Sequence, residues 1–428
     1  MENSVGGVRA LKNGDIVMAR RVAEAVEGAG GRVYYVGGFV RDRLLGLDNK
    51  DVDIEVHGVS VSTLEGILDD LGERTTMGAS FGIMGLRHYG LDIAMPRSER
   101  ATGRGHRDFE VFVDPFIGVQ KAALRRDFTM NALMQDVLTG EILDFFGGRA
   151  DMAARRIRHV NDASFAEDPL RVFRAAQFAA RFGFDVAQET TALCATMDVG
   201  ALAQERVMGE LEKTLMKAGR PSIFFVELKK MDRLAHWFGP LAALPEAGWL
   251  DTMAALDAAA ALRGEARQPL CFMLAAACAG LDGEEAGRFL SRLTNEAMLT
   301  RYVLNMCARV RAFDDLLRDD ADADRWMALF DGSVCPEDLL LLEQALRGRD
   351  GWDAKAAELR ALLALYRARM AQPCVMGRDL VAAGVKPGKA MGEALAYAHG
   401  LRLAGMPKAE QLERTLAYIE ARKEGEGR

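Results

Sequence analysis

Two short motifs near the N-terminus have the residue types and spacing needed for chemistry on phosphates. The first is Tyr35-Val36-Gly37-Gly38-Phe39-Val40-Arg41-Asp42, a pattern typical of a strand, a tight turn and a helix that begins at the turn. A Gly-Gly turn lets backbone N–H groups approach a triphosphate without obstruction, and the N-terminus of a helix favours the negative charge. We therefore expect a nucleotide phosphate beside Gly38, with Arg41 in the opening turns of the helix.

The second motif, Lys50-Asp51-Val52-Asp53-Ile54, predicts a strand that carries two carboxylates. Because side chains alternate along a strand, Asp51 and Asp53 share one face, while Val52 and Ile54 point the other way into a core. Two oxygen ligands on one face suit Mg²⁺ when the ion must also hold phosphate oxygens. Together the motifs indicate a nucleotidyl-transfer site in which Asp51 and Asp53 are both metal ligands and catalytic residues.

The composition limits the class of protein. With 428 residues, half of them hydrophobic, the chain is long enough for a large core and for more than one domain. Six cysteines without CxxC spacing are typical of free thiols in a reducing cytoplasm rather than of zinc sites or disulfides. The N-terminus lacks a signal-peptide pattern, and no apolar stretch approaches the roughly 20 residues of a membrane helix. We therefore expect a cytoplasmic protein without a membrane partner.

Charge is distributed unevenly along the chain. The formal net charge of −7 argues against a uniformly basic surface for nucleic acid. Residues 366–428, however, contain eleven Lys or Arg against seven Asp or Glu, a net of +4. An RNA-binding face can exist there as a local patch, although such a run is also typical of an ordinary solvated surface.

The hydrophobic pattern changes character at about residue 150. Before it, residues 10–30 predict an amphipathic helix, and the following apolar runs are short, β-like and separated by Gly. After it, strand signals vanish and Ala, Leu, Arg and Glu dominate. We predict an α+β fold, with a sheet domain over 1–150 followed by all-helical segments over 151–218, 219–365 and 366–428.

Four further strings follow in order, and with the first two motifs they cover about residues 33–215. They are Arg125-Arg126-Asp127-Phe128-Thr129-Met130-Asn131-Ala132-Leu133, Gly147-Gly148-Arg149-Ala150-Asp151, Glu167-Asp168-Pro169-Leu170-Arg171 and Glu205-Arg206-Val207-Met208-Gly209-Glu210-Leu211. The set resembles the DNA polymerase beta-like nucleotidyltransferases and, within them, the class II tRNA nucleotidyltransferase and bacterial poly(A) polymerase family. The resemblance implies a polymerase-beta-like nucleotidyltransferase head, a helical neck that reads the nucleotide, a helical body and a tail that binds tRNA.

The mechanism that the resemblance implies is two-metal phosphoryl transfer. Mg²⁺ ions held by Asp51 and Asp53 would activate an RNA 3′-hydroxyl and neutralise charge as pyrophosphate leaves. The alternative is that Asp51 and Asp53 are solvated carboxylates at the end of a strand and bind no metal, which is the better guess for an Asp-x-Asp pair taken at random. A third carboxylate often lies on a neighbouring strand in this superfamily, and Asp92 is the candidate here. The resemblance does not require it, so Asp92 stays outside the predicted metal set.

Arginines are expected around the phosphates. Guanidinium groups can bind triphosphate oxygens bidentately, so we predict that Arg41 and Arg126 contact the nucleotide. A purely structural role remains open, because Arg41 or Arg125 could pair with Asp42 or Asp127.

The string around Asp168 is expected to select the base. We predict one helix from about Ser164, in which steps of three residues place Asp168, Arg171 and Arg174 within an arc of roughly 120°. A carboxylate beside a guanidinium complements the amino donor and ring-nitrogen acceptor of cytosine and adenine, and mismatches uracil and guanine. The local sequence alone favours an N-cap, because Asp168 precedes a proline, and the match to the family's base-reading motif reverses that preference.

One position departs from the family pattern. The family usually carries an arginine three residues after the position of Arg174, and this chain has Gln177. Either Gln177 still hydrogen-bonds the nucleotide, as we predict, or the nearby Arg181 supplies the charge.

Several segments favour a tRNA enzyme that adds full CCA. The segment 77–82 resembles the tRNA enzymes, the polar segment 97–107 matches a loop that assists the switch from C to A, and segments 377–380 and 386–393 resemble their tail. We predict template-independent addition of CCA to tRNA 3′ ends from CTP and ATP, with release of pyrophosphate. The alternatives are CC-only or A-only addition, poly(A) synthesis, a non-catalytic RNA-binding role, and nucleotidylation of a small molecule.

Overall fold

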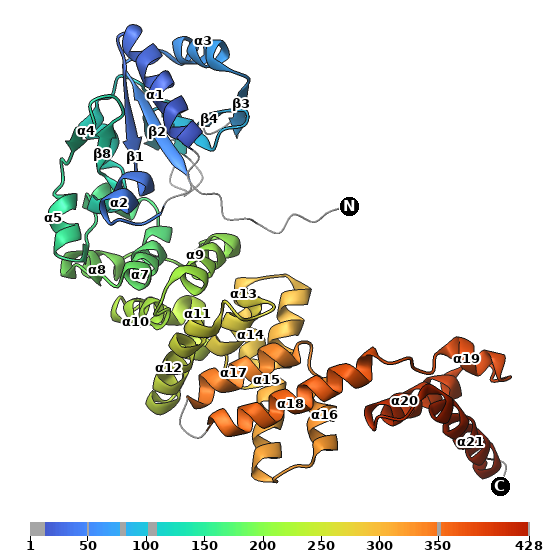
Figure 1. The fold of residues 1–428 in the computed structure, drawn as a ribbon. Helices are drawn as coiled ribbons and strands as arrows, with labels where there is room; N and C mark the ends of the chain where they lie inside the picture. The colour runs from blue at the N-terminus through green and yellow to red at the C-terminus, as the bar shows by residue number, and fades with distance from the viewer. Residues whose placement is uncertain (1–12, 49–50, 78–82, 102–108, 349–351, 427–428) are drawn as a thin grey trace. The chain divides into compact units, whose positions relative to one another are not determined.

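The structure, a computed structural model, describes residues 13–48, 51–77, 83–101, 109–348 and 352–426. Two compact units make up the chain (Figure 1). Unit 1 contains residues 1–202 and 230–233, and unit 2 contains residues 203–229 and 234–428. The finer division into four parts stays a prediction.

A mixed seven-stranded sheet forms the centre of unit 1 (Figure 1). In spatial order its strands are β3 (Arg74–Met77), β4 (Ile83–Leu86), β5 (Leu91–Ala94), β2 (Val52–His57), β1 (Arg32–Val36), β8 (Met134–Asp136) and β9 (Ile142–Leu143). β1 is antiparallel to β2 and β8, whereas β2 and β5 are parallel. Parallel strands need a crossover, which here consists of α3 (Val61–Leu71) and the antiparallel pair β3–β4.

Alternation along β2 decides which side chains are available for chemistry. Val52, Ile54 and Val56 are at most 1% exposed, and α1 (Asn13–Gly28) packs against β1 and β2. The opposite face of β2 carries Asp53 and Glu55. The predicted strand and its core-facing residues are therefore confirmed.

The predicted turn and helix after β1 are also confirmed. Gly37 has a positive φ of 62°, a conformation that glycine adopts without strain, and α2 (Gly38–Leu44) begins at the next residue.

Further elements of unit 1 are not strands of the seven-stranded sheet. They are β6 (Arg97–Ala101), β7 (Phe109–Val113), α4 (Val119–Leu124), η1 (Thr129–Asn131), α5 (Gly148–Ala153), β10 (Arg156–Ile157), α6 (Asp162–Ala166), α7 (Leu170–Phe182), β11 (Asp185–Val186) and α8 (Gln188–Cys194). β6 and β7 pair as a separate antiparallel hairpin, which overlaps the predicted loop over 97–107. Residues 102–108 of that region, and residues 78–82 of the segment 77–82, lie outside the described residues.

The described residues of unit 2 form only helices. These are α9 (Gln204–Lys217), α10 (Ser222–Lys230), α11 (Leu234–Ala242), α12 (Glu246–Leu262), α13 (Pro269–Ala277), α14 (Gly283–Leu293), α15 (Ala297–Arg318), α16 (Ala323–Asp331), α17 (Pro336–Arg347), α18 (Trp352–Ala371), α19 (Gly377–Ala382), α20 (Lys389–Leu403) and α21 (Lys408–Glu426). The last three share a small core of Val375, Leu380, Ala394, Ala398 and Ile419. The predicted α+β fold, a sheet domain followed by a mainly helical region, is confirmed. The segment 151–218 is not all-helical as predicted, because it contains the short parallel pair β10–β11.

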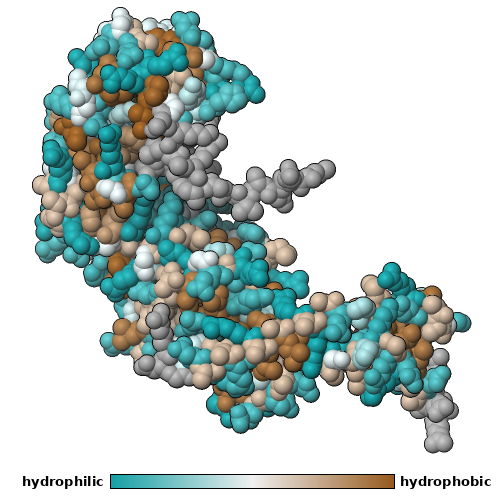
Figure 2. Space-filling view, in the orientation of Figure 1, coloured by the Kyte–Doolittle hydropathy of each residue, from teal (hydrophilic) through white to brown (hydrophobic). Residues whose placement is uncertain are grey.

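Exposed hydrophobic side chains are scattered over the surface. Figure 2 shows hydrophobic residues in small groups between hydrophilic ones. The most exposed large ones, Met298 and Phe116, come from different units. Within the described part of the chain, no helix combines the length and the apolar character needed to cross a membrane.

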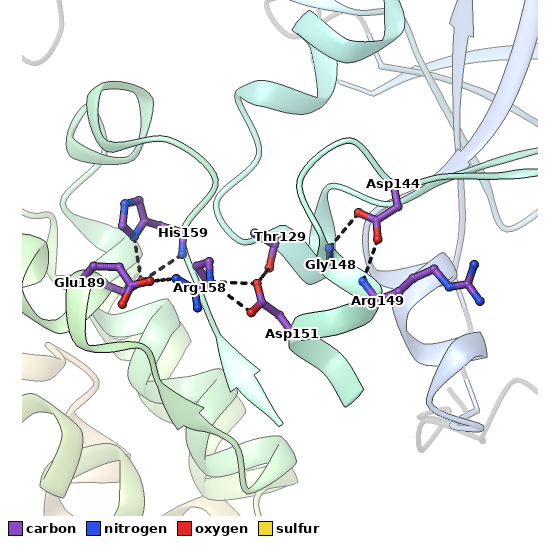
Figure 3. Close-up of polar contacts among 9 residues, drawn as sticks. Thr129, Asp144, Gly148, Arg149, Asp151, Arg158, His159 and Glu189 are labelled. Carbon is purple, nitrogen blue, oxygen red and sulfur yellow. Dashed lines mark hydrogen bonds and ion pairs between the residues drawn. The ribbon is translucent and has the colours of Figure 1, made fainter. Parts of the chain in front are cut away.

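A helix cap explains part of the Gly147–Asp151 string (Figure 3). The carboxylate of Asp144 accepts hydrogen bonds from the backbone N–H groups of Gly148 and Arg149, at 2.8 and 3.0 Å. These bonds satisfy donors that the first turn of α5 leaves without helical partners.

A buried carboxylate explains the end of the same string (Figure 3). Asp151 accepts from the hydroxyl of Thr129 at 2.8 Å and from Nε of Arg158 at 3.1 Å. Arg158 also pairs with Glu189 of α8. The string therefore fixes α5 to η1 and, through Arg158, to α8.

Gly148 leaves no room for a side chain, which gives a test of this packing. A Cβ atom at this position would lie 2.3 Å from the backbone carbonyl oxygen of Thr129. We expect Gly148→Ala to lower the free energy of unfolding by about 1–3 kcal/mol, as overpacking does. Urea unfolding measures the change.

Gly66→Ala in α3 is the matched control. Nothing lies within 4 Å of a Cβ atom there, and alanine favours a helix over glycine by about 1 kcal/mol, so this variant should be neutral or stabilised. Equal destabilisation of both variants would contradict the close approach of Thr129.

Candidate functional site

Unit 1 contains a cavity of about 400 Å³ beside β1, β2 and β5. Half of its lining residues are charged: Asp53, Glu55, Asp92, Arg97, Arg125, Arg126 and Arg171. Carboxylates and guanidinium groups in one concave site suit a ligand that brings both phosphate oxygens and a cation. This cavity is the candidate functional site.

Two aspartates, Asp53 and Asp92, line one side of the cavity. Asp53 and Asp92 are neighbours across the parallel β2–β5 pair, and Asp51 is exposed immediately before β2. Burial, and then the charges of Asp92 and Asp51, raise the pKa of Asp53 to about 6, against the opposing charge of Arg126. Burial and the charge of Asp51 raise the pKa of Asp92. A divalent cation would relieve this repulsion, and Asp53 and Asp92 could supply two oxygen ligands. Among the described residues, no set of three metal-ligating side chains is assembled.

Four charged residues of the cavity lining were absent from the predicted set: Glu55, Asp92, Arg97 and Arg125. Glu55 follows Asp53 by two positions on β2, so strand alternation could have identified it. Asp92 was left undecided, because its place opposite Asp53 depends on the register of β2 and β5. That register results from the crossover between the strands and leaves no signal in the local sequence.

Arg126 lies where the Gly37-Gly38 turn meets the cavity. It lines the cavity, and its Nη2 donates to Oε2 of Glu55 at 3.0 Å. A Cβ atom on Gly37 would lie 3.3 Å from Nη1 of Arg126, so the guanidinium packs against this turn. Gly38, the first residue of α2, follows directly. Arg126 thus lies against Gly37, the residue before Gly38, whereas Gly38 itself is not among the residues that line the cavity.

Arg41 is buried away from the cavity lining. Its guanidinium donates to Oδ1 of Asp42 at 2.7 Å and to Oδ1 of Asn131 at 2.6 Å. It also lies over the rings of Phe178 and Phe182, 5.1 and 4.8 Å from their centroids. Burial lowers the pKa of Arg41, against the opposing charge of Asp42. The pairing with Asp42 that the sequence left open is present, and a nucleotide contact by Arg41 stays a prediction.

Asp127 is the centre of a buried polar network. It accepts from Nε of Arg174 at 2.7 Å and from Nδ2 of Asn131 at 2.9 Å. Burial acts to raise the pKa of Asp127, but Arg174 and the hydrogen bonds hold it below its ordinary value. Because Asn131 also accepts from Arg41, the network runs from α7 through η1 to α2.

The segment before α7 differs from the prediction. α6 ends at Ala166 and α7 begins at Leu170, so the prediction of one helix from about Ser164 is wrong. The residue before a proline disfavours helical dihedral angles, which accounts for the break at Asp168. Asp168 lies outside α7 and accepts from the N–H of Leu170 at 3.1 Å. The capping role that the local sequence favoured is therefore present.

Arg171 does lie in the cavity, and backbone carbonyls orient it. Its Nη1 donates to the carbonyl of Ser164 at 2.6 Å, and its Nη2 to the carbonyl of Arg125 at 3.0 Å. Burial lowers its pKa, against the opposing charges of Asp127 and Asp168. The base-reading role predicted for Asp168, Arg171 and Arg174 stays a prediction.

The two residues proposed for the far end of α7 are not part of the cavity lining. Gln177 is 2% exposed, and Arg181 donates to Oδ2 of Asp42 at 3.2 Å. Arg181 thus extends the buried network. The contact between Gln177 and the nucleotide stays a prediction.

The raised pKa of Asp53 gives a test of the site's electrostatics. Its pKa in the folded state, about 6, exceeds the ordinary value of 3.8, so proton binding favours the folded state. That contribution is complete below pH 3.8 and is lost as the pH rises through about 6. At pH 8 without metal, Asp53→Asn should raise the free energy of unfolding by about 1–3 kcal/mol.

The gain from Asp53→Asn should shrink as the pH falls from 8 to 5, because the wild-type carboxyl then takes up its proton. Urea unfolding in EDTA at both pH values measures the difference. A gain that does not depend on pH would argue against electrostatic repulsion as its cause.

Parts of the chain are similar to known proteins. Residues 33–158 match the poly A polymerase head domain family. The Multifunctional CCA protein of Stenotrophomonas maltophilia (strain K279a) is 42% identical over 222 residues, which are 50% of this chain and 52% of that protein. The protein of the same name from Halorhodospira halophila (strain DSM 244 / SL1) is 40% identical over 247 residues, 54% of this chain and 58% of that protein. The chain thus spans about half the length of the curated relatives it matches.

Solved structures match nearly the whole chain at lower identity. A Thermotoga maritima CCA-adding enzyme complexed with tRNA is 23% identical with a TM-score of 0.68, and the match covers 96% of this chain and 97% of that one. A CCA-adding enzyme in complex with CTP is 22% identical with a TM-score of 0.72, covering 97% and 96%. The resemblance inferred from the motifs is confirmed: residues 33–158 match the poly A polymerase head domain family, and the chain shares its fold with solved CCA-adding enzymes.

Proposed function

We propose that this protein adds CCA to tRNA 3′ ends without a nucleic-acid template, using CTP and ATP and releasing pyrophosphate. One observation carries the proposal: a single cavity brings Asp53, Arg126 beside the Gly37-Gly38 turn, and Arg171 together. Asp53 could bind the metal, Arg126 the triphosphate and Arg171 the base of one nucleotide. The names of the relatives, and of solved structures with tRNA, CTP and ATP, support the same substrates.

The aspartate cluster would hold the divalent metal, which we propose to be Mg²⁺. Asp51 and Asp53 are the predicted ligands, and Asp92 is placed to join them. When bound, the metal would neutralise triphosphate charge and favour deprotonation of the RNA 3′-hydroxyl. Arg126 and the turn at Gly38 would bind the phosphates and orient the α-phosphorus toward that hydroxyl.

Base choice is proposed to lie with Asp168 and Arg171. Carbonyl contacts hold the guanidinium of Arg171 in the cavity, so its remaining N–H donors can meet the ring-nitrogen acceptor of cytosine or adenine. The carboxylate of Asp168 would accept from the exocyclic amino group. Arg174 has its Nε on Asp127, and Arg41 and Gln177 are buried, so nucleotide contacts by these three need a rearrangement when the ligand binds.

The helical segments would recognise the RNA. We propose residues 151–218 as a neck that reads the nucleotide, 219–365 as a body and 366–428 as a tail. The tail's local excess of basic residues could contact tRNA phosphates. A tRNA substrate and six free cysteines are also consistent with the cytoplasmic location that we propose.

An addition assay tests the function directly. A tRNA transcript that lacks CCA is incubated with Mg²⁺ and CTP, ATP or both, and the products are resolved to single nucleotides. Three additions in the order C, C, A support the proposal. Addition of CC alone or of A alone would indicate a partial enzyme, long A tails a poly(A) polymerase, and no addition a different function.

Removal of a metal ligand should abolish transfer. We expect Asp53→Asn to reduce the rate of addition by more than about 100-fold, since even groups that only orient metal ligands contribute about 10- to 100-fold. Asp69→Asn is the control, because Asp69 pairs with Arg74 outside the cavity and should leave the rate unchanged. A comparable loss in both variants would speak against a metal role for Asp53.

Removal of the proposed acceptor should relax base choice. We expect Asp168→Ala to reduce the preference for CTP over UTP by about 10-fold or more. Without the carboxylate, the carbonyl oxygen that uracil presents in place of the amino group of cytosine no longer meets a negative charge. The ratio of kcat/KM for the two nucleotides measures the effect. Asp162→Ala, at an exposed position in α6, is the control, and an unchanged ratio in Asp168→Ala would refute the assignment.

A further inference from the structure

We propose that Glu55 is a positioning residue that holds Arg126 at the phosphate side of the cavity and away from the metal-binding carboxylates. The inference rests on the proposed function, in which Arg126 binds the triphosphate and Asp53 holds the metal. Neither role accounts for a third acidic side chain, two residues after Asp53, that contacts an arginine.

Both oxygens of Glu55 are engaged in the structure. Oε2 accepts from Nη2 of Arg126 at 3.0 Å, and Oε1 lies 2.9 Å from Nε2 of His57. Burial acts to raise the pKa of Glu55, but His57 and Arg126 hold it below its ordinary value. Because its oxygens already have partners, Glu55 is better placed to orient Arg126 than to bind a metal.

His57 fixes the orientation of the Glu55 carboxylate. The imidazole is buried, and its edge meets the ring of Tyr34 with centroids 5.5 Å apart and planes at 85°. Nδ1 has no hydrogen-bond partner among the described residues. A proton on Nε2 is therefore the arrangement that gives this contact a donor, with the oxygen of Glu55 as its acceptor.

Arg126 needs such a partner because of what else lines the cavity. The carboxylates of Asp53 and Asp92 share the lining with Arg126, and the charge of Arg126 already acts on Asp53. A guanidinium without its own counter-ion would be drawn to these carboxylates and would compete with the metal. Glu55 gives it another carboxylate on the same strand.

The opposite side of the guanidinium is limited by the glycine turn. Nη1 of Arg126 would lie 3.3 Å from a Cβ atom on Gly37, so Arg126 is held between Glu55 and this turn. A guanidinium has five N–H donors, and Arg126 uses Nη2 to donate to Glu55. The remaining donors can serve a triphosphate that binds at the turn.

Replacement of Glu55 by glutamine tests the inference, because it removes the charge and keeps the shape. For Glu55→Gln, we expect the KM for CTP and the dissociation constant of CTP to rise by about 10- to 100-fold, the scale known for groups that orient direct metal ligands. The kcat at saturating CTP should fall much less. Steady-state addition to a tRNA lacking CCA gives KM and kcat, and isothermal titration calorimetry gives CTP binding without turnover.

A double-mutant cycle identifies the residue through which Glu55 acts. In an Arg126→Ala background, Glu55→Gln should change CTP affinity by no more than about twofold, since the side chain that it orients is gone. Full additivity of the two losses would overturn the inference. Glu73→Gln, which breaks the exposed pair with Arg87 in the same unit, is the control and should behave as the wild type.

Two further results distinguish a failure of the role inferred for Glu55 from a failure of the proposed function. CTP binding by Glu55→Gln equal to that of the wild type overturns the inference, whatever the enzyme does to tRNA. Absence of nucleotide addition by the wild-type protein overturns the proposed function, and the CTP titrations still test Glu55. If Glu55→Gln fails to fold, Glu55→Asp keeps the charge on a shorter side chain and should show the same weaker binding of CTP.

Discussion

The repulsion between the carboxylates of Asp53 and Asp92, on the paired strands β2 and β5, is the constraint on which the arrangement of the cavity depends. Parallel pairing places Asp53 beside Asp92, with Asp51 immediately before the strand. Bringing such charges together in a partly buried cavity is unfavourable unless cations balance them. Burial, and then the charges of Asp92 and Asp51, raise the pKa of Asp53 to about 6, so its ionised form is disfavoured in the protein alone.

The surrounding arginines are distributed so that several have acceptors of their own. Arg126 is bound to Glu55, Arg174 to Asp127, and Arg171 to two backbone carbonyls. The two of these that line the cavity, Arg126 and Arg171, therefore have acceptors other than Asp53 and Asp92. In the proposed function, this separation leaves Asp53 and Asp92 to bind a metal and holds the two guanidinium groups in place for the nucleotide.

Sequence reasoning succeeded where the determining interactions are local. Alternation along β2 and the glycine turn before α2 follow from residues adjacent in the chain, and both are present. It failed at Asp168, where the proline that follows breaks the expected helix. It could not place Asp92, whose position depends on a strand crossover, or show that the phosphate-binding candidate Arg41 would be buried against η1 and α7. Those positions depend on long-range packing, which a local pattern does not contain.

The buried network along α7 also explains why the chain can differ from its family at Gln177. Two carboxylates, Asp42 and Asp127, pair with the guanidinium groups of Arg41, Arg174 and Arg181 in this network, which leaves one positive charge in excess. Gln177 lies between Arg174 and Arg181 on the same helix and is 2% exposed. A fourth guanidinium there would deepen this excess in a setting that solvates ions poorly, whereas a neutral amide does not. The cost of a further buried positive charge, rather than contact with a nucleotide, is then sufficient to account for glutamine at this position.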